Sequence, residues 1–464
     1  MLTSVVGLLA GALVVGLLLK LDGGGSALPD EPSAVPGSAA LPGPLDRPDL
    51  LVPLTGVQGS APSRAGLAGA LGPLMSGLGG SVGVSVVDGA RGTLLYGADA
   101  DIPRTPASTT KLLTASAALS VLGPQKTLST KVVAGPDSGG IILVGGGDPT
   151  LTTADEGTAV YPTPASLSAL AARTAAALKD RGTRSVHLDY DDSLFTGPDL
   201  PQGWTTRYFI GTQAVVARVS ALAVDGGRLA PSDPTRSTQP AQRAADRFAE
   251  LLQARGIDVQ GVPGRTDARR SAKELAAVAS PPVSSLVERM LTNSDNDIAE
   301  ALARQVAIAR GNEASFAGGA QAVAQAIGKL GIDLRGLILN DGSGLSHANA
   351  IPPKVLTDVL LAAGKRPELR AVLSGLPVAG FSGTLWDRAA VSDTNGGAPD
   401  LDSAGVVRAK TGSLNGVSAL AGVVADKDGR LLVFAVLADH VLSRAQAEHA
   451  LDRIAAELAS CGCQ

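Results

Sequence analysis

The first apolar run of the chain covers residues 1–19 and contains no charged side chain before Lys20. As a helix it would be about 28 Å long, close to the roughly 30 Å hydrocarbon core of a bilayer. We therefore predict that residues 1–21 form a membrane-spanning signal peptide or a retained anchor. A signal peptide usually has a basic start and a small-residue cleavage site. Neither is evident here, so the choice between the two stays open.

A turn-forming stretch follows this run. Residues 22–64 are rich in Pro, Gly, Ala and Ser. This composition cannot bury enough apolar surface to offset the entropy that is lost when a chain becomes ordered. We predict that residues 22–66 form a disordered tether.

Strand and helix patterns begin after the tether. Two β-rich runs around a Gly-containing turn predict a hairpin at 82–101. Helix formers at 108–122 follow Pro106 and stop at Gly123. Strand signals dominate at 131–147. Further helical patterns lie at 165–179, 240–255, 283–310, 314–330 and 353–363, and the third is interrupted near 293–297 by residues that favour loops and caps.

The C-terminal part returns to strands. Three apolar runs are separated by turn signals such as Asp428-Gly429. The runs cover 406–412, 417–426 and 430–439. A last helix carries an apolar stripe at i, i+3, i+4 and i+7, suited to lying on a sheet. The stripe consists of Leu451, Ile454, Ala455 and Leu458.

Strands at both ends of the chain could complete one sheet. We predict an α+β fold in which a central antiparallel sheet is flanked by helices. Residues 67–127 and 283–464 would form this domain, and residues 128–282 would form an inserted α/β domain.

Composition narrows the function classes. The 464 residues include 39 basic and 43 acidic ones, a net charge of −4, and the two signs are interspersed. A nucleic-acid binder carries a concentrated basic stripe, so this class is disfavoured. Only Cys461 and Cys463 are cysteines, which excludes a Cys-rich zinc site and a disulfide scaffold. A small terminal bridge and two free thiols both remain compatible with the sequence.

Candidate chemistry starts in the predicted helix at 108–122. Lys111 is the only lysine of the chain with a serine three residues before it, and residues three apart share a helix face. Lys111 can therefore reach the hydroxyl of Ser108. Serine needs a base to take its proton, and lysine can be that base when burial or a nearby cation lowers its pKa. The alternative is that Ser108 only caps the helix.

Two further motifs change this interpretation. A Ser-Asp-Asn motif at 294–296 falls in the predicted helix break, and a Lys-Thr-Gly motif at 410–412 falls on a predicted strand. Alone, the first is usually a cap or turn, and the second a strand end with an exposed charge. Together with Ser108 and Lys111 they match the serine, amide and lysine set of β-lactamases and penicillin-binding proteins.

The surrounding sequence resembles one family over about residues 80–460. The relevant segments are PASTTKLLTA, LVGGGDPTL, VSALAVDGGRLAP, LTNSDNDIAEALARQ, NDGSGLS, LPVAGFSGTLWDR and AKTGSLNGVSALAG. They resemble the D-alanyl-D-alanine carboxypeptidase/endopeptidase family, the low-molecular-mass class C penicillin-binding proteins. The resemblance implies a transpeptidase-like catalytic domain with an extra domain inserted between the first two motifs.

Residue chemistry then suggests the catalytic roles. Ser108 would attack the carbonyl of a D-Ala-D-Ala bond, and Lys111, held neutral near Lys410, would take its proton. Ser294 would relay a proton to the leaving amine. Asn296 would orient Lys111 and the substrate amide, because its side chain both donates and accepts.

The strand motif would bind the substrate. Lys410 would supply positive potential for the terminal carboxylate. The resemblance adds Thr411 and Ser413 as carboxylate ligands, with Gly412 beside them in the substrate-binding segment. It also implies the backbone N–H groups of Ser108 and Ser413 as oxyanion donors. No metal and no cofactor are expected.

The expected partners are peptidoglycan stem peptides that end in D-Ala, and β-lactam antibiotics as covalent inhibitors. No nucleic-acid partner is expected, and the membrane would be contacted through residues 1–21. The expected location is the outer face of the cytoplasmic membrane or the cell wall space.

Two other functions stay open at this point. A β-lactamase would need a water-activating carboxylate, but no Glu-x-x-Leu-Asn arrangement lies between the first two motifs. A non-catalytic protein that binds muropeptides or β-lactams would also carry such motifs. Carboxypeptidase and endopeptidase activity cannot be separated, because both break a bond that follows D-Ala. The turn at 341–344 fits either a pocket segment or a structural turn.

Overall fold

Five strands from the two ends of the chain form one antiparallel sheet with the order β10-β11-β12-β1-β2. The computed structural model describes residues 60–157, 160–201, 203–208, 214–230, 232–388 and 403–463. In the sheet, β1 (Ser81–Asp88) pairs with β12 (Leu431–Asp439), so the N-terminal hairpin meets the C-terminal strands as predicted. The other strands are β2 (Leu94–Ala98), β10 (Val407–Leu414) and β11 (Val417–Ala425).

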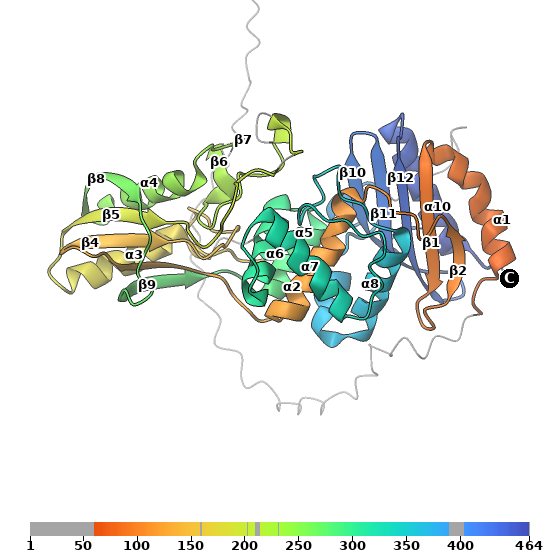
Figure 1. Cartoon of the computed structure of the whole chain (residues 1–464), viewed down its shortest axis with the longest axis horizontal. Helices are drawn as coiled ribbons and strands as arrows, with labels where there is room; N and C mark the ends of the chain where they lie inside the picture. Colours follow the sequence, from red (N-terminus) through yellow and green to blue (C-terminus); the bar gives the residue numbers. More distant parts are fainter. Residues whose placement is uncertain are drawn as a thin grey trace, which may run out of the picture. The chain divides into compact units, whose positions relative to one another are not determined.

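Helices cover both faces of this sheet, as Figure 1 shows. On β12, Phe434 packs with α1 (Arg64–Met75) and α10 (Arg444–Ser460), whereas its neighbour Val433 packs with the helices of the opposite face. This alternation is the two-residue period of a strand that is buried on both sides. The predicted stripe of the last helix is confirmed, because all four of its residues are buried in the same cluster as Phe434: Leu451, Ile454, Ala455 and Leu458.

The helices of the opposite face surround α2 (Lys111–Leu122). They are α5 (Val283–Thr292), α6 (Asn296–Arg310), α7 (Phe316–Lys329), α8 (Pro353–Lys365) and α9 (Arg370–Ser374). The sequence predicts an α-helix from residue 108, but a 3-10 turn, Ala107–Thr110, precedes α2. The hydroxyls of Thr109 and Thr110 donate to the carbonyls of Pro106 and Ala107 at 2.7 and 2.9 Å, which favours this tighter turn. We call the first sheet with these helices the Ser108 region.

A second five-stranded sheet lies between β2 and α5 in the sequence and has the order β8-β5-β4-β3-β9. The β4-β5 and β5-β8 pairs are parallel and the others antiparallel. Helices α3 (Leu167–Lys179) and α4 (Pro240–Gln253) share its apolar core. The strands are β3 (Ser129–Ala134), β4 (Gly140–Val144), β5 (Ser185–Asp191), β8 (Asp258–Arg265) and β9 (Glu274–Ala279). We call residues 129–279 the second-sheet region.

The chain enters and leaves this region at adjacent points. Leu128 and Ser280 are joined by two hydrogen bonds, from Leu128 N to Ser280 Oγ at 2.9 Å and from Ser280 N to the Leu128 carbonyl at 2.8 Å. A short hairpin, β6 (Arg228–Ala230) and β7 (Asp233–Arg236), also belongs to it. The division of the chain into a catalytic domain and an insert at 128–282 stays a prediction.

Both ends of the described chain meet. Cys461 and Cys463 form a disulfide, so of the two sequence interpretations the structure has the terminal bridge. Ser63 N donates to the Cys463 carbonyl at 2.6 Å, and α1 begins at Arg64, inside the predicted tether. Within the described ranges, no helix combines the length and the apolarity needed to cross a membrane. The predicted span at 1–21 lies outside these ranges.

Candidate active site

Ser108 lies in the 3-10 turn, at the point where the chain enters α2. Ala107, directly before it, has a φ of 47°, a left-handed conformation that is unfavourable for a residue with a Cβ. Such strain costs about 1–3 kcal/mol and persists only where the surroundings enforce it. The half-buried Ser108 side chain lines a cavity of about 1780 Å³. Of the other predicted site residues, Ser294, Asn296 and Ser413 line this cavity, whereas Lys111, Lys410, Thr411 and Gly412 do not.

Lys111 connects three parts of the site. Its Nζ lies 2.9 Å from Ser108 Oγ, 2.7 Å from Asn296 Oδ1 and 2.6 Å from the Ser343 carbonyl oxygen. Burial lowers the pKa of Lys111 to about 8, and the charge of Asp341 is the largest influence that opposes the shift. With this pKa the amine is neutral in about a tenth of the molecules at pH 7. Lys111 can therefore accept a proton near neutral pH.

The Ser-Asp-Asn motif forms the turn between α5 and α6 and the start of α6. Ser294 has a φ of 56°, and its hydroxyl makes no hydrogen bond within the described part of the chain. Asp295 caps α6 by accepting a hydrogen bond from Ile298 N at 3.0 Å. Asn296 accepts from Lys111 and donates through Nδ2 to the Val215 carbonyl at 2.9 Å. The motif thus caps a helix and at the same time presents Asn296 to Lys111.

The Lys-Thr-Gly motif lies on β10, which is an edge strand of the first sheet. A Cβ at Gly412 would lie 2.7 Å from the Pro106 carbonyl oxygen and 3.3 Å from the Ala107 Cβ. Only glycine therefore lets β10 approach the Ser108 turn this closely. The strand motif and the predicted nucleophile are neighbours in space.

Lys410 is fully buried, and its Nζ donates to the Thr411 carbonyl at 2.9 Å. Burial, followed by the positive charges of Lys111 and Arg388, lowers its pKa well below the usual value. No hydrogen bond joins Lys410 to Ser108 within the described residues. An anion bound beside Lys410 would favour its protonated form.

The hydroxyls on either side of Gly412 already have partners. The Thr411 hydroxyl lies 2.7 Å from that of Thr384, and the Ser413 hydroxyl donates to Glu448 at 2.9 Å. A substrate carboxylate bound by Ser413 would have to compete with Glu448.

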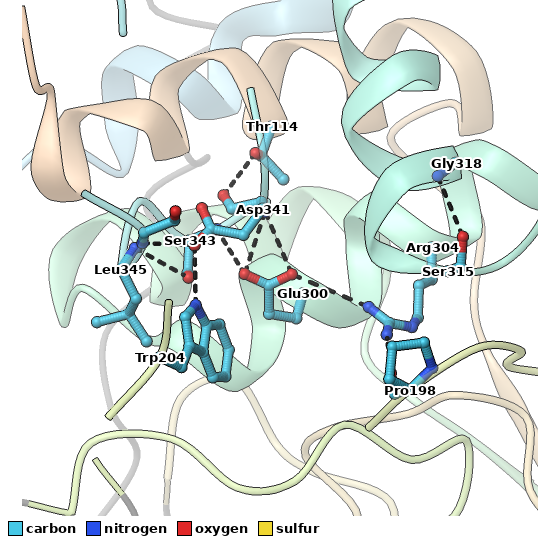
Figure 2. A network of polar contacts seen from close by, with 12 residues as sticks. Thr114, Pro198, Trp204, Glu300, Arg304, Ser315, Gly318, Asp341, Ser343 and Leu345 are labelled. Carbon is cyan, nitrogen blue, oxygen red and sulfur yellow. Dashed lines mark hydrogen bonds and ion pairs between the residues drawn. The ribbon is translucent and has the colours of Figure 1, made fainter. Parts of the chain in front are cut away.

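The loop at 341–346 completes the surroundings of Lys111. The Ser343 carbonyl accepts from Lys111, and Glu300 of α6 accepts from Ser343 N at 2.8 Å. Asp341 accepts from the loop nitrogens of Gly344 and Ser346 at 2.8 and 2.7 Å. Figure 2 shows Glu300 and Asp341 within this network.

Sequence reasoning named the 341–344 turn as one of two options but missed Glu300 and the Ser343 carbonyl. A backbone carbonyl has no sequence signature. Glu300, in contrast, follows Asn296 by four residues on one helix, so its place on the same helix face was a usable signal.

The cavity lining is strongly cationic, although the whole chain is slightly acidic. Among the described residues, seven arginines and three aspartates line it. The arginines are Arg207, Arg228, Arg236, Arg243, Arg247, Arg289 and Arg444. Several of them are held by protein carbonyls or carboxylates, as when Arg243 donates to the Arg228 carbonyl at 3.1 Å. The field in the cavity favours an anionic ligand.

A metal centre is not visible in the part of the chain that the structure describes. There, no cluster of three or more His, Cys, Asp or Glu side chains could hold a metal ion.

Comparison with known proteins places the chain in a family. The model of the D-Ala-D-Ala carboxypeptidase 3 (S13) family matches residues 75–234 and 227–459. The chain is 36% identical over 439 residues to Carboxypeptidase DacB of Mycolicibacterium smegmatis, covering 93% of this chain and 90% of that protein. The chain belongs to the D-Ala-D-Ala carboxypeptidase 3 family. It is also 30% identical to the D-alanyl-D-alanine carboxypeptidase of Actinomadura sp. strain R39, covering 75% of this chain and 76% of that protein.

A solved structure of the same kind supports the fold. Penicillin binding protein 4 (dacB) from Haemophilus influenzae, complexed with a novel β-lactam, has a TM-score of 0.66 and 22% identity to this chain. The match covers 84% of this chain and 99% of that one. The predicted family, the serine-type carboxypeptidase class and the α+β penicillin-binding-protein fold are confirmed.

Proposed function

We propose that the chain hydrolyses the D-Ala-D-Ala bond of peptidoglycan stem peptides through an acyl-enzyme on Ser108, and that penicillin acylates the same hydroxyl. The observation that supports this most directly is the 2.9 Å contact between Lys111 Nζ and Ser108 Oγ in a fully buried lysine of lowered pKa. A serine hydroxyl that is hydrogen-bonded to such an amine is an activated nucleophile.

Acylation begins with proton transfer from Ser108 Oγ to neutral Lys111. The oxygen attacks the carbonyl carbon of the scissile bond, and the resulting oxyanion accepts hydrogen bonds from backbone N–H groups, for which we propose Ser108 and Ser413. The C–N bond then breaks. Ser294, which lines the same cavity, passes a proton to the departing amine of D-Ala. Water later hydrolyses the ester and restores the Ser108 hydroxyl.

The terminal carboxylate of the substrate would lie beside β10. Lys410 has no carboxylate partner within hydrogen-bond distance among the described residues, and its pKa is lowered. A bound carboxylate would raise this pKa and protonate Lys410, and the resulting ion pair would hold the substrate. Thr411 and Ser413 are the proposed hydroxyl donors. The cationic lining of the cavity suits a peptide with additional carboxylates.

Peptidoglycan lies outside the cytoplasmic membrane, so this proposal places the enzyme at the outer face of that membrane or in the cell wall space. The part of residues 1–21 in its attachment there stays a prediction.

The test is labelling with a fluorescent penicillin, followed by mass analysis of the products from a pentapeptide that ends in D-Ala-D-Ala. We expect wild type to be labelled and to release D-Ala, and Ser108→Ala to do neither. Ser374→Ala is the matched control, since this exposed hydroxyl on α9 only contacts Glu288 and Arg370.

Three other results of this labelling experiment would contradict the proposed function. A label that survives Ser108→Ala contradicts the nucleophile assignment. Rapid loss of label from wild type indicates a β-lactamase instead. Stable labelling without any cleaved peptide indicates a protein that binds penicillin but is not a peptidase.

A further inference from the structure

The direction of the Lys111 lone pair decides whether this lysine can act as a base. A neutral amine has two N–H bonds and one lone pair. Proton transfer from Ser108 requires the lone pair to point at Oγ, so both N–H bonds must be directed elsewhere. The two other oxygens within hydrogen-bond distance of Nζ are Asn296 Oδ1 at 2.7 Å and the Ser343 carbonyl oxygen at 2.6 Å. These two acceptors together aim the lone pair at Ser108.

Asn296 is fixed by its own helix, but a loop carbonyl such as that of Ser343 needs external support. Glu300 supports the loop on one side of the Ser343 carbonyl. Its Oε1 accepts from Ser343 N at 2.8 Å, and its two oxygens accept from Gly342 N at 3.1 and 3.2 Å. Thr114 of α2 supports the loop on the other side, because the Thr114 hydroxyl donates to the Gly342 carbonyl at 2.7 Å. Figure 2 shows these contacts converging on the loop.

Glu300 is itself held in place. It is 1% exposed and lies one helical turn after Asn296, so a single helix carries one acceptor of Lys111 and the support of the other. Arg304 Nη1 lies 4.0 Å from Glu300 Oε2, and the Arg304 guanidinium lies 4.1 Å from the centre of the Phe316 ring. A buried carboxylate with two backbone donors and a stacked arginine has little freedom to move.

We propose that Glu300 is a positioning residue for acylation, which fixes the Ser343 carbonyl so that neutral Lys111 directs its lone pair at Ser108. The proposal rests on the proposed role of Lys111 as the base. Glu300 touches neither Ser108 nor the Lys111 amine in this network. It acts through the backbone of one loop.

The charge of Glu300 gives the proposal an electrostatic signature. Burial lowers the pKa of Lys111, and the Glu300 carboxylate is among the groups that raise it. The burial of Glu300 raises the pKa of this carboxyl group to about 7. The charged groups around Lys111 come from the loop, from α6 with its cap, and from β10. They are Asp341, Glu300, Asp295, Asp297 and Lys410. Removal of the Glu300 charge should therefore lower the pKa of Lys111.

The experiment measures the second-order rate of acylation by fluorescent penicillin as a function of pH. In Glu300→Gln, the amide oxygen can take the place of Oε1 and accept from Ser343 N and Gly342 N, but the amide nitrogen then stands at the place of Oε2, 3.2 Å from Gly342 N. Two donors face each other there, so the loop should shift. We expect the rate to fall by up to about 100-fold, the loss that a misplacement of about 1 Å can cause. We also expect the rising limb of the pH profile, near pH 8 in wild type, to move to lower pH.

Asp88→Asn is the matched control. Asp88 is also a fully buried carboxylate that accepts from two loop nitrogens, those of Ala90 and Arg91, and it is paired with an arginine, Arg430, but it does not line the cavity. We expect this variant to lose thermal stability and to keep both the acylation rate and the pH profile. Equal rates and pH profiles in wild type and Glu300→Gln would overturn the proposal. A rate loss in Glu300→Gln that is matched by Asp88→Asn would do so as well.

Thr114→Val separates geometry from charge and covers the case in which Glu300→Gln does not fold. It removes the other support of the loop without changing any charge. We expect a slower acylation with an unshifted pH profile, and an unchanged rate would contradict the positioning role of the loop. Failure of the proposed function gives a different result from failure of the positioning role. In that case, wild type either takes up no label or carries a label that survives Ser108→Ala.

Discussion

The two sheet regions of the molecule differ in what they bury. The second-sheet region has an apolar core of mostly aliphatic side chains with Phe248 fully buried among them. The Ser108 region and its loop at 341–346 contain ionisable side chains that are 1% exposed or less. Four of them surround the site: Lys111, Glu300, Asp341 and Lys410. Burial of a charge is unfavourable unless partners compensate it. The Ser108 region therefore combines apolar clusters on both faces of its sheet with buried charges that oppose folding.

Backbone strain occurs at two of the motifs but is not confined to them, since Asp225 of the second-sheet region has a φ of 53°. Ala107 precedes the nucleophile with a φ of 47°, and Ser294 of the second motif has a φ of 56°. At Ala107 this conformation is accompanied by close packing, because Gly344 lies directly against the Ala107 carbonyl. Sites that need strained or desolvated groups give up stability that other regions must supply.

The largest effect concerns the core of the second-sheet region. Phe248→Ala should lower the free energy of unfolding by about 3–5 kcal/mol, because it leaves a cavity in a closely packed core. The acylation rate of the protein that remains folded should not change. Thermal unfolding and fluorescent-penicillin labelling at a temperature below the transition check both parts. Gln253→Ala, an exposed position on the same helix, should change neither quantity. Slower acylation by folded Phe248→Ala would show that this core also supports the site.

Much of the fold followed from pattern. The N-terminal hairpin, the three C-terminal strands and the stripe on α10 were predicted from periods of two and of 3.6 residues, and they meet in one sheet. Patterns of this kind are reliable where one face of an element is buried. The parallel pairing of β4 with β5 could not be predicted, since it depends on a crossover rather than on local sequence.

The candidate site was predictable only in part. Ser108 and Lys111 were paired by their spacing, and the structure joins them at 2.9 Å, although through a 3-10 turn rather than an α-helix. The Ser343 carbonyl was not predictable, because any residue can supply a backbone oxygen. The contact of Asn296 with Val215 joins residues that are distant in sequence, and no local pattern encodes such a contact.

The next effect concerns the packing that strains the Ser108 turn. Gly344 has a φ of +86°, and a Cβ there would lie 1.9 Å from the Ala107 carbonyl oxygen. Gly344→Ala should push the loop away from the nucleophile and slow acylation by at least about 100-fold. The control is Gly311→Ala at the end of α6, where φ is +75° and no atom lies within 4 Å of the new Cβ. It should be destabilised by a similar strain and still acylate normally. If both variants acylate at equal rates, the close packing at Gly344 has no part in the chemistry.

The smallest effect tests whether the buried lysine of β10 destabilises the fold. Lys410→Met replaces a desolvated amine by an apolar side chain of similar length, so it should raise the free energy of unfolding by about 1–2 kcal/mol. The folded-state pKa of Lys410 is lowered, so between that value and 10.5 the unfolded chain binds more protons than the folded one. Wild type therefore becomes more stable as pH rises through this window, and the advantage of Lys410→Met should shrink. Lys131→Met, on a strand of the second sheet where the lysine is only half-buried, should give no such gain. Equal unfolding midpoints for Lys410→Met and wild type across the pH range would mean that burial of this lysine does not measurably lower the free energy of unfolding. The contrast between the two regions would then rest on Lys111 and its carboxylates alone.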